Sequence, residues 1–107
     1  MKITIFYVGS SLLAPLKQAE REINRVHKVD LRVAAYNFGS PLSDGEWEDV
    51  ERDLQETKIV FVIHVMDGEN ATRLISALDK VRNDAVVVIN CMPELMRRTR
   101  RKSGKSR

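Results

Sequence analysis

Two short apolar runs constrain the fold of this chain more than any other feature. Residues 59–63 read Ile-Val-Phe-Val-Ile and residues 85–89 read Ala-Val-Val-Val-Ile, and charged or polar residues flank both runs. A strand without polar alternation is typical of a parallel sheet that helices cover on both faces. We therefore expect two central strands with four buried valines: Val60, Val62, Val86 and Val88.

The first part of the chain predicts a strand, a helix and a second strand. Residues 3–8 are mostly β-branched or aromatic, which is typical of a strand. Apolar residues then recur at helical spacing up to Val26, and a serine cap with Pro15 in the first turn predicts that this helix begins close to Ser11. Residues 29–36 largely alternate between apolar and polar, so we expect the second strand at an edge of the sheet.

Three further helices are expected. Residues 43–46 read Ser-Asp-Gly-Glu, which matches the capping box at the start of a helix. Apolar residues recur at helical spacing over residues 71–81 and predict another helix. Pro93 at a first helical position and Glu94 in the first turn predict a last helix of about two turns.

Strand and helix alternate four times, which predicts an α/β fold. We expect an open parallel four-stranded sheet in the flavodoxin-like order 2-1-3-4, with right-handed crossovers and helices on both faces. Because 107 residues suffice for one domain and hardly for two, residues 1–101 are expected to form a single domain. Residues 102–107 are expected to form a basic flexible tail.

Charge and composition exclude several classes of protein. Seven of the 18 Lys and Arg residues lie in residues 97–107, which leaves residues 1–96 with 11 bases against 15 acids. The basic end lacks interleaved aromatic residues and the acidic body would repel phosphate, so we expect no nucleic-acid partner. No apolar run approaches the roughly 18 residues of a membrane span, and the single cysteine, Cys91, favours a reducing cytoplasm.

The expected strand order places a ligand crevice where the first and third strands end. Five polar residues fall there: Ser10, Ser11, His64, Asp67 and Glu69. The serines fit either an anion site or an ordinary helix cap, and the histidine and acids fit either a metal or acid–base cluster or structural hydrogen bonding. The structural interpretation is favoured in each case. Because the acids are dispersed, we expect no useful affinity for magnesium or nucleotide in the isolated chain.

A resemblance to a known family is carried by residues 90–100, which read Asn-Cys-Met-Pro-Glu-Leu-Met-Arg-Arg-Thr-Arg. This segment resembles the end of the N-terminal domain of the large, porphyrin-binding H-type subunit of magnesium chelatase and of the related cobaltochelatase large subunit. Residues 60–69 and the four-fold strand–helix order support the similarity. The family usually continues with a Leu/Met-Gly-x-Phe segment, whereas residues 102–107 read Lys-Ser-Gly-Lys-Ser-Arg.

The resemblance implies that this segment is the N-terminal domain, or a fragment of it, of a much larger subunit. That subunit is expected to insert magnesium or cobalt into a tetrapyrrole, as in chlorophyll or cobalamin biosynthesis, with ATP used by partner subunits. The implied partners are therefore the remainder of the large subunit and the ATPase subunits, and the segment itself is expected to hold no cofactor and to catalyse nothing. The alternative is a free-standing flavodoxin-like module that binds a ligand or a protein in the crevice.

The matched residues are expected to be structural. They are Met92, Pro93, Glu94 and Met96. The proline suits a helix start, the acid suits the helix dipole, and the methionines are expected to fill gaps in the core.

Overall fold

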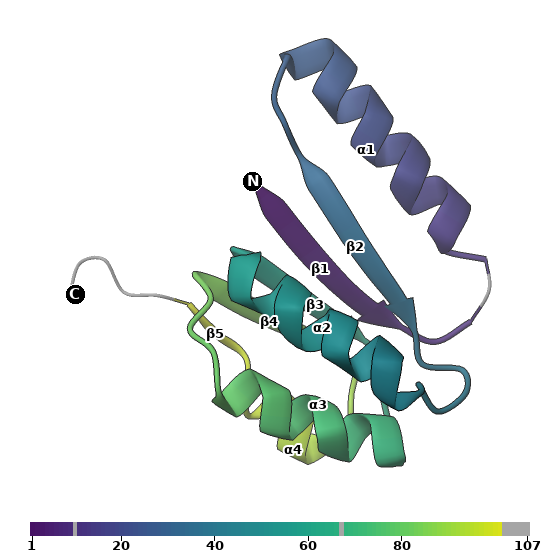
Figure 1. Cartoon of the computed structure of the whole chain (residues 1–107), viewed down its shortest axis with the longest axis vertical. Coiled ribbons are helices and arrows are strands. Elements are labelled where there is room, and N and C mark those ends of the chain that lie inside the picture. The colour runs from purple at the N-terminus through teal and green to yellow at the C-terminus, as the bar shows by residue number, and fades with distance from the viewer. Residues whose placement is uncertain (10, 67, 102–107) are drawn as a thin grey trace.

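The computed structural model describes residues 1–9, 11–66 and 68–101. The elements follow in the order β1 (Lys2–Tyr7), α1 (Leu13–His27), β2 (Arg32–Asn37), α2 (Asp44–Glu56), β3 (Ile59–Ile63), α3 (Glu69–Asp79), β4 (Ala85–Ile89), α4 (Pro93–Met96) and β5 (Arg100–Arg101). They form one sheet in the order β2-β1-β3-β4-β5 (Figure 1). The first four strands are parallel, which confirms the α/β fold and the order 2-1-3-4.

The expectation of four strands was incomplete, because β5 adds a short antiparallel edge beside β4. The last helix, expected to run for about two turns, ends at Met96 after four residues. Contacts with α3 and β4 explain the early end. The Thr99 hydroxyl accepts a hydrogen bond from the Val88 N–H at 3.1 Å, and the Arg100 guanidinium donates to the Leu78 carbonyl at 3.2 Å. The expected tail, residues 102–107, lies outside the described residues.

The helices cover the two faces of the sheet unequally. Both α2 and α3 lie over one face, while α1 lies beside β2 (Figure 1). Right-handed crossovers explain this arrangement. The first crossover runs toward β2 and the next two run in the opposite direction, so they bring their helices to opposite faces. The expectation that helices cover β3 and β4 on both faces was therefore wrong for the residues that the structure describes.

The main core lies between the sheet and the helices α2 and α3. The four central valines are buried as expected, since Val60, Val62 and Val86 are 0% exposed and Val88 is 6% exposed. Trp47 of α2 and Leu74 of α3 are among the large side chains packed against them. The capping box is also confirmed: the Ser43 hydroxyl accepts from the Glu46 N–H, and the Glu46 carboxylate accepts from the Ser43 N–H.

Polar side chains of α1 bind the free edge of β2. Asn24 donates to the Leu31 carbonyl at 2.8 Å and accepts from the Leu31 N–H at 2.7 Å. Glu20 accepts from the Val33 N–H at 2.8 Å, and Lys17 donates to the Val33 carbonyl at 2.6 Å. These bonds satisfy backbone groups that an exposed edge strand leaves open to pairing with another chain.

The helix α1 begins close to Ser11, as expected, but it lacks the expected serine cap. The helix begins at Leu13, and its N-cap is Leu12, which makes no capping bond through its side chain. Ser11 is an exposed loop residue, so its expected role as a cap is not found. Pro15 lies in the first turn, as expected.

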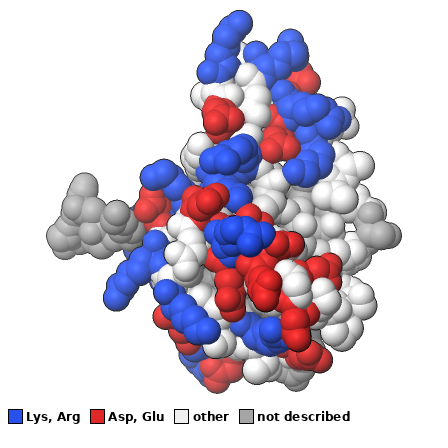
Figure 2. All heavy atoms as spheres, in the orientation of Figure 1, with Lys and Arg blue, Asp and Glu red and all other residues white. Residues whose placement is uncertain are grey.

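Charge is also distributed unevenly over the surface. Acidic side chains gather over α2 in the view of Figure 2. They come from a helix that has seven acids and one base among thirteen residues: Asp44, Glu46, Glu48, Asp49, Glu51, Asp53 and Glu56, with Arg52. Among the described helices, none combines the length and the apolar character needed to cross a bilayer.

Candidate functional site

A crevice of about 350 Å³ opens at the carboxyl ends of β1 and β3. Its walls come from the end of β1, the loops after β2 and β3, and the first turn of α3. The lining residues are Val8, Phe38, Gly39, Ser40, Pro41, His64, Val65, Met66, Gly68, Glu69, Asn70 and Ala71. This position agrees with the switch point predicted from the strand order, and the loop after β2 adds a wall that the prediction lacked.

The predicted site residues are only partly brought together. His64 and Glu69 line the crevice, whereas Ser11 does not. Ser10 and Asp67 lie outside the described residues. Within residues 1–9, 11–66 and 68–101, no three His, Cys, Asp or Glu side chains lie close enough together to hold a metal ion.

Asn70 fixes the shape of the crevice, and the sequence interpretation missed it. Its side chain is 8% exposed, accepts a hydrogen bond from the Leu42 N–H at 3.0 Å, and donates one to the Ser40 carbonyl at 2.9 Å. These bonds join the loop after β2 to the first turn of α3. The one signal in the sequence is an amide residue in the first turn of a helix, which by itself predicts only local capping.

His64 is held in a strained backbone conformation at the mouth of the crevice. Its φ is 58°, and the residue that follows β4, Asn90, has a φ of 54°. The Asn90 amide lies 3.1 Å from Nδ1 of His64, and the His64 N–H donates to the Ile89 carbonyl at 3.0 Å. The ends of β3 and β4 are therefore joined through two left-handed residues, and the structural interpretation of His64 accounts for all these contacts.

Aromatic side chains support the apolar side of the crevice. Phe38 packs against Phe6 with a ring-centroid distance of 5.2 Å and against Trp47 at 5.8 Å. The Arg73 guanidinium lies 5.1 Å from the Trp47 ring centroid and pairs with Asp44 at 3.1 Å. The crevice thus has an apolar wall supported by packed aromatic rings, and the first turn of α3, with the acidic Glu69, also lines it.

The segment that carries the family resemblance lies beyond β4. Pro93 is at the first position of α4 as expected, and Met92 is half-buried against the core. Glu94 pairs with Arg98 at 3.1 Å. Met96 is 42% exposed, so the expectation that it fills a core gap was wrong. In this one-turn helix a single side chain points into the core, and that side chain is Leu95, which is 0% exposed.

The side chain of the single cysteine, Cys91, forms hydrogen bonds with backbone groups. The Cys91 sulfur accepts from the Val65 N–H at 3.2 Å and lies 3.3 Å from the Ile89 carbonyl, to which its thiol donates. The residue is half-buried beside the core. These contacts support a structural role for this thiol.

Two polar clusters away from the crevice perturb the pKa values of their members. Burial, together with the hydrogen bond to the Asp53 carboxylate and its charge, raises the pKa of Tyr36 well above its usual range. Burial works to lower the pKa of Lys2, but ion pairs with Asp53 at 2.5 Å and Glu56 at 3.3 Å outweigh it, so that pKa is raised. At the other end of the fold, hydrogen bonds from the Arg98 guanidinium lower the pKa of Asp79.

Comparison with known proteins finds one family. A model described as a domain of unknown function, DUF3479, matches residues 2–102. No curated protein matches the chain.

Proposed function

The chain belongs to the DUF3479 family, and we propose that it is the N-terminal domain of the large subunit of an ATP-dependent chelatase that inserts magnesium or cobalt into a tetrapyrrole. The parent subunit would act in the cytoplasm, in chlorophyll or cobalamin biosynthesis, while partner subunits hydrolyse ATP. In this proposal the domain is an accessory unit that carries no catalytic group. The remainder of the large subunit and the ATPase subunits are its partners.

One observation carries the proposal: the segment that resembles the chelatase subunits, residues 90–100, also completes the fold. Leu95 is fully buried in the main core. Arg98 joins this segment to α3 through Asp79, with contacts of 3.2 and 2.9 Å. The burial of Leu95 and the bonds of Arg98 each require a particular residue type at a fixed position. This requirement supports the interpretation of residues 90–100 as a family signature.

The proposal is tested first by sequencing the gene past the codon for Arg107. It requires a reading frame that continues for about another thousand codons into the rest of a chelatase large subunit. A stop codon directly after Arg107, with neither tetrapyrrole-synthesis genes nor ATPase genes nearby, would shift the conclusion to the alternative below.

A second test measures the activity of the parent subunit. Residues 1–101 are deleted in frame, and metal insertion is assayed with the ATPase partners, ATP, porphyrin and magnesium or cobalt. We expect at least a tenfold loss, while exchange of the exposed Gln18 for Ala in the full subunit serves as the control and leaves the rate unchanged. Full activity of the subunit that lacks residues 1–101 would contradict the proposed role of this domain.

The alternative is a free-standing module, and the crevice of about 350 Å³ favours it. Its apolar lining residues Phe38, Pro41 and Met66 suit the flat ring of a ligand such as flavin mononucleotide. Fluorescence titration of the isolated chain with that flavin tests this function. Binding with a dissociation constant of micromolar order, weakened by Met66→Asp, would support the module, and unquenched flavin at millimolar protein would exclude this ligand.

A further inference from the structure

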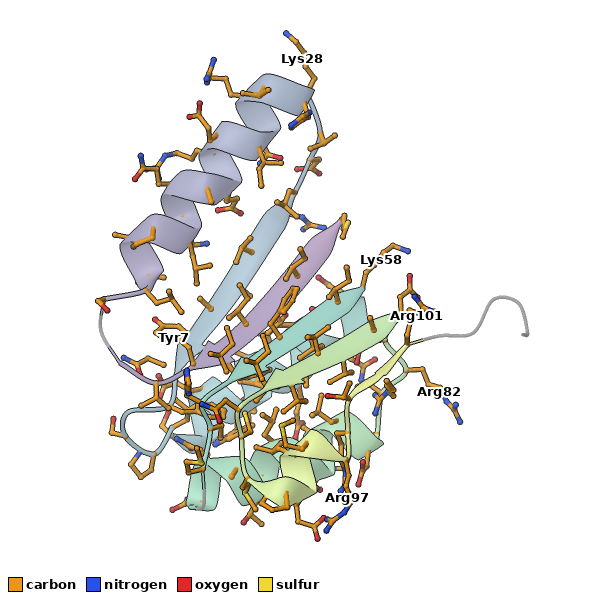
Figure 3. All side chains as sticks on the ribbon, turned by 180° about the vertical axis from the view of Figure 1, so that it is seen from behind. Tyr7, Lys28, Lys58, Arg82, Arg97 and Arg101 are labelled. Carbon is orange, nitrogen blue, oxygen red and sulfur yellow. The ribbon has the colours of Figure 1, made fainter. Side chains whose placement is uncertain are left out.

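One face of the sheet lacks a helix over β3 and β4 in the described part of the chain. Seen from behind, these strands lie in front of α2 and α3, and α1 lies to one side, next to β2 (Figure 3). Strand register and alternation assign six residues of β3 and β4 to this open face: Ile59, Phe61, Ile63, Ala85, Val87 and Ile89. All six are apolar, whereas strands that face water usually alternate apolar and polar residues. The open face therefore favours an apolar ligand.

An apolar hollow of about 340 Å³ adjoins the open face at the start of β1. Its walls come from the last turns of α1, the loop that follows and the start of β1. The lining residues are Met1, Ile3, Ile23, Val29, Asp30 and Leu31, and Asp30 alone among them is charged. Ile3 points to the same side of the sheet as the open face, because its neighbour Thr4 points the other way and bonds Thr57 at 2.6 Å. This volume lies within the range of small-molecule sites.

A row of side chains leads from this hollow across the open face. In the strand register, Ile3 lies beside Ile59, and Ile59 lies beside Ala85. On the next strand, Arg101 lies opposite Ala85. Residues paired in this way present their side chains to the same face of a sheet. Because neighbouring strands are about 4.8 Å apart, the row is roughly 14 Å long from Ile3 to Arg101.

The row ends in a positive charge that is open to a ligand. Arg100 turns to the opposite face, where its guanidinium donates to the Leu78 carbonyl at 3.2 Å, so alternation leaves Arg101 on the open face. Arg101 is exposed at the end of the face where β3 and β4 begin (Figure 3). Among the residues that the structure describes, no carboxylate forms an ion pair with Arg101, and Asp84 pairs with Lys58 at 3.8 Å.

We propose that the hollow and this row bind a medium-chain fatty acid. Its alkyl chain runs from the hollow over Ile59 and Ala85, and its carboxylate pairs with Arg101. The charges at the two ends of the row set this direction, since Asp30 repels a carboxylate from the hollow and Arg101 attracts it. Phe61 and Val87, one step further along the strands, form an apolar border beside the chain. The inference is independent of the proposed chelatase role.

Isothermal titration calorimetry of the 107-residue chain with sodium dodecanoate tests the proposal. The titration is made at pH 7, where the ligand is ionised, and below the concentration at which it forms micelles. We expect a dissociation constant on the order of 10–100 µM, because much of the bound chain stays open to water. Hexanoate is too short to reach from the hollow to Arg101, and dodecyltrimethylammonium carries the opposite charge. Each should bind at least tenfold more weakly than dodecanoate.

Two variants locate the ligand, each with a matched control. Val29→Glu places a charge in the hollow and should weaken dodecanoate at least tenfold, whereas Leu13→Glu, at the other end of α1, should leave its affinity unchanged. Val29 and Leu13 are 51% and 44% exposed, so both variants are expected to fold. Arg101→Gln should weaken dodecanoate at least fivefold and remove its advantage over dodecyltrimethylammonium. Arg97→Gln, beside α4 (Figure 3), is the control for lost charge.

Circular dichroism at the start and end of each titration shows whether the chain stays folded. The absence of binding at millimolar dodecanoate would overturn the proposal. Equal affinities of the wild-type chain for dodecanoate and dodecyltrimethylammonium would contradict the role of Arg101. A folded Val29→Glu chain that keeps the wild-type affinity would show that the alkyl chain does not enter the hollow.

Discussion

At the scale of single residues, Asn70 has the largest predicted effect on the crevice. The change Asn70→Ala leaves the Leu42 N–H and the Ser40 carbonyl without their side-chain partner. A buried polar group that loses its hydrogen bond costs about 1–3 kcal/mol, and we expect the free energy of unfolding to fall by that amount. Urea unfolding at 25 °C followed by circular dichroism measures it.

The matched control is Ser76→Ala on the exposed side of α3, which should change the free energy of unfolding by less than about 0.5 kcal/mol. Equal unfolding midpoints for Asn70→Ala and Ser76→Ala would show that Asn70 does not hold the loop after β2.

A second prediction concerns Tyr36 and the stability of the fold at alkaline pH. Its pKa is raised in the folded state, mainly by burial and then by the Asp53 carboxylate, so the folded chain holds the phenol proton more tightly than the unfolded chain does. The resulting stability is complete below the unfolded pKa of about 10 and is lost as the pH rises above it. Wild type should therefore be more stable than Tyr36→Phe at pH 7, by roughly 1 kcal/mol, and this difference should shrink above pH 10.

Urea midpoints of both proteins between pH 7 and pH 11 measure the difference. Lys2 is present in both chains, so its own titration acts on both and largely cancels. A difference that stays constant up to pH 11 would contradict the raised pKa of Tyr36.

The sequence predicted the crevice position but only part of its lining. His64 and Glu69 follow directly from the strand order, because the residue after a parallel strand lies at the carboxyl edge of the sheet. Asn70 and Phe38 did not follow from it. The two groups that Asn70 binds lie 28 and 30 residues away, and such a tertiary contact leaves no periodic pattern in the sequence.

At the scale of elements, α1 depends on polar contacts with β2 more than on burial. Asn24 makes two hydrogen bonds to the backbone of Leu31, and the helix has no buried residue. We expect Asn24→Ala to lower the free energy of unfolding by about 1–2 kcal/mol, because the N–H and the carbonyl of Leu31 both lose their side-chain partner. Thermal unfolding followed by circular dichroism measures the loss.

Gln18→Ala, on the exposed side of the same helix, is the control and should unfold at the wild-type temperature. If Asn24→Ala also unfolds at that temperature, the polar contacts are not what holds α1 against the sheet.

Elements with a strong periodic pattern were predicted well. The strands β3 and β4 match the expected bounds, and α2 follows its capping box. The short β5 and the early end of α4 were missed. A two-residue strand is too short to show alternation, and its position depends on the contacts of Arg100 and Thr99 with distant backbone.

At the scale of the whole molecule, we expect the helix on one face of the sheet, α1, to be locally less stable than α2 and α3 on the other face. Three residues of α2 and five of α3 are buried, whereas α1 contributes no residue to the core. Segments with little burial open with a lower free energy than the rest of a fold. The amides of α1 should therefore exchange with deuterium at least tenfold faster than those of α3. Mass spectrometry of peptic fragments measures these rates, and the fragment from α2 serves as an internal reference. Equal protection of α1 and α3 would mean that the edge contacts with β2 stabilise α1 as strongly as burial stabilises the opposite face.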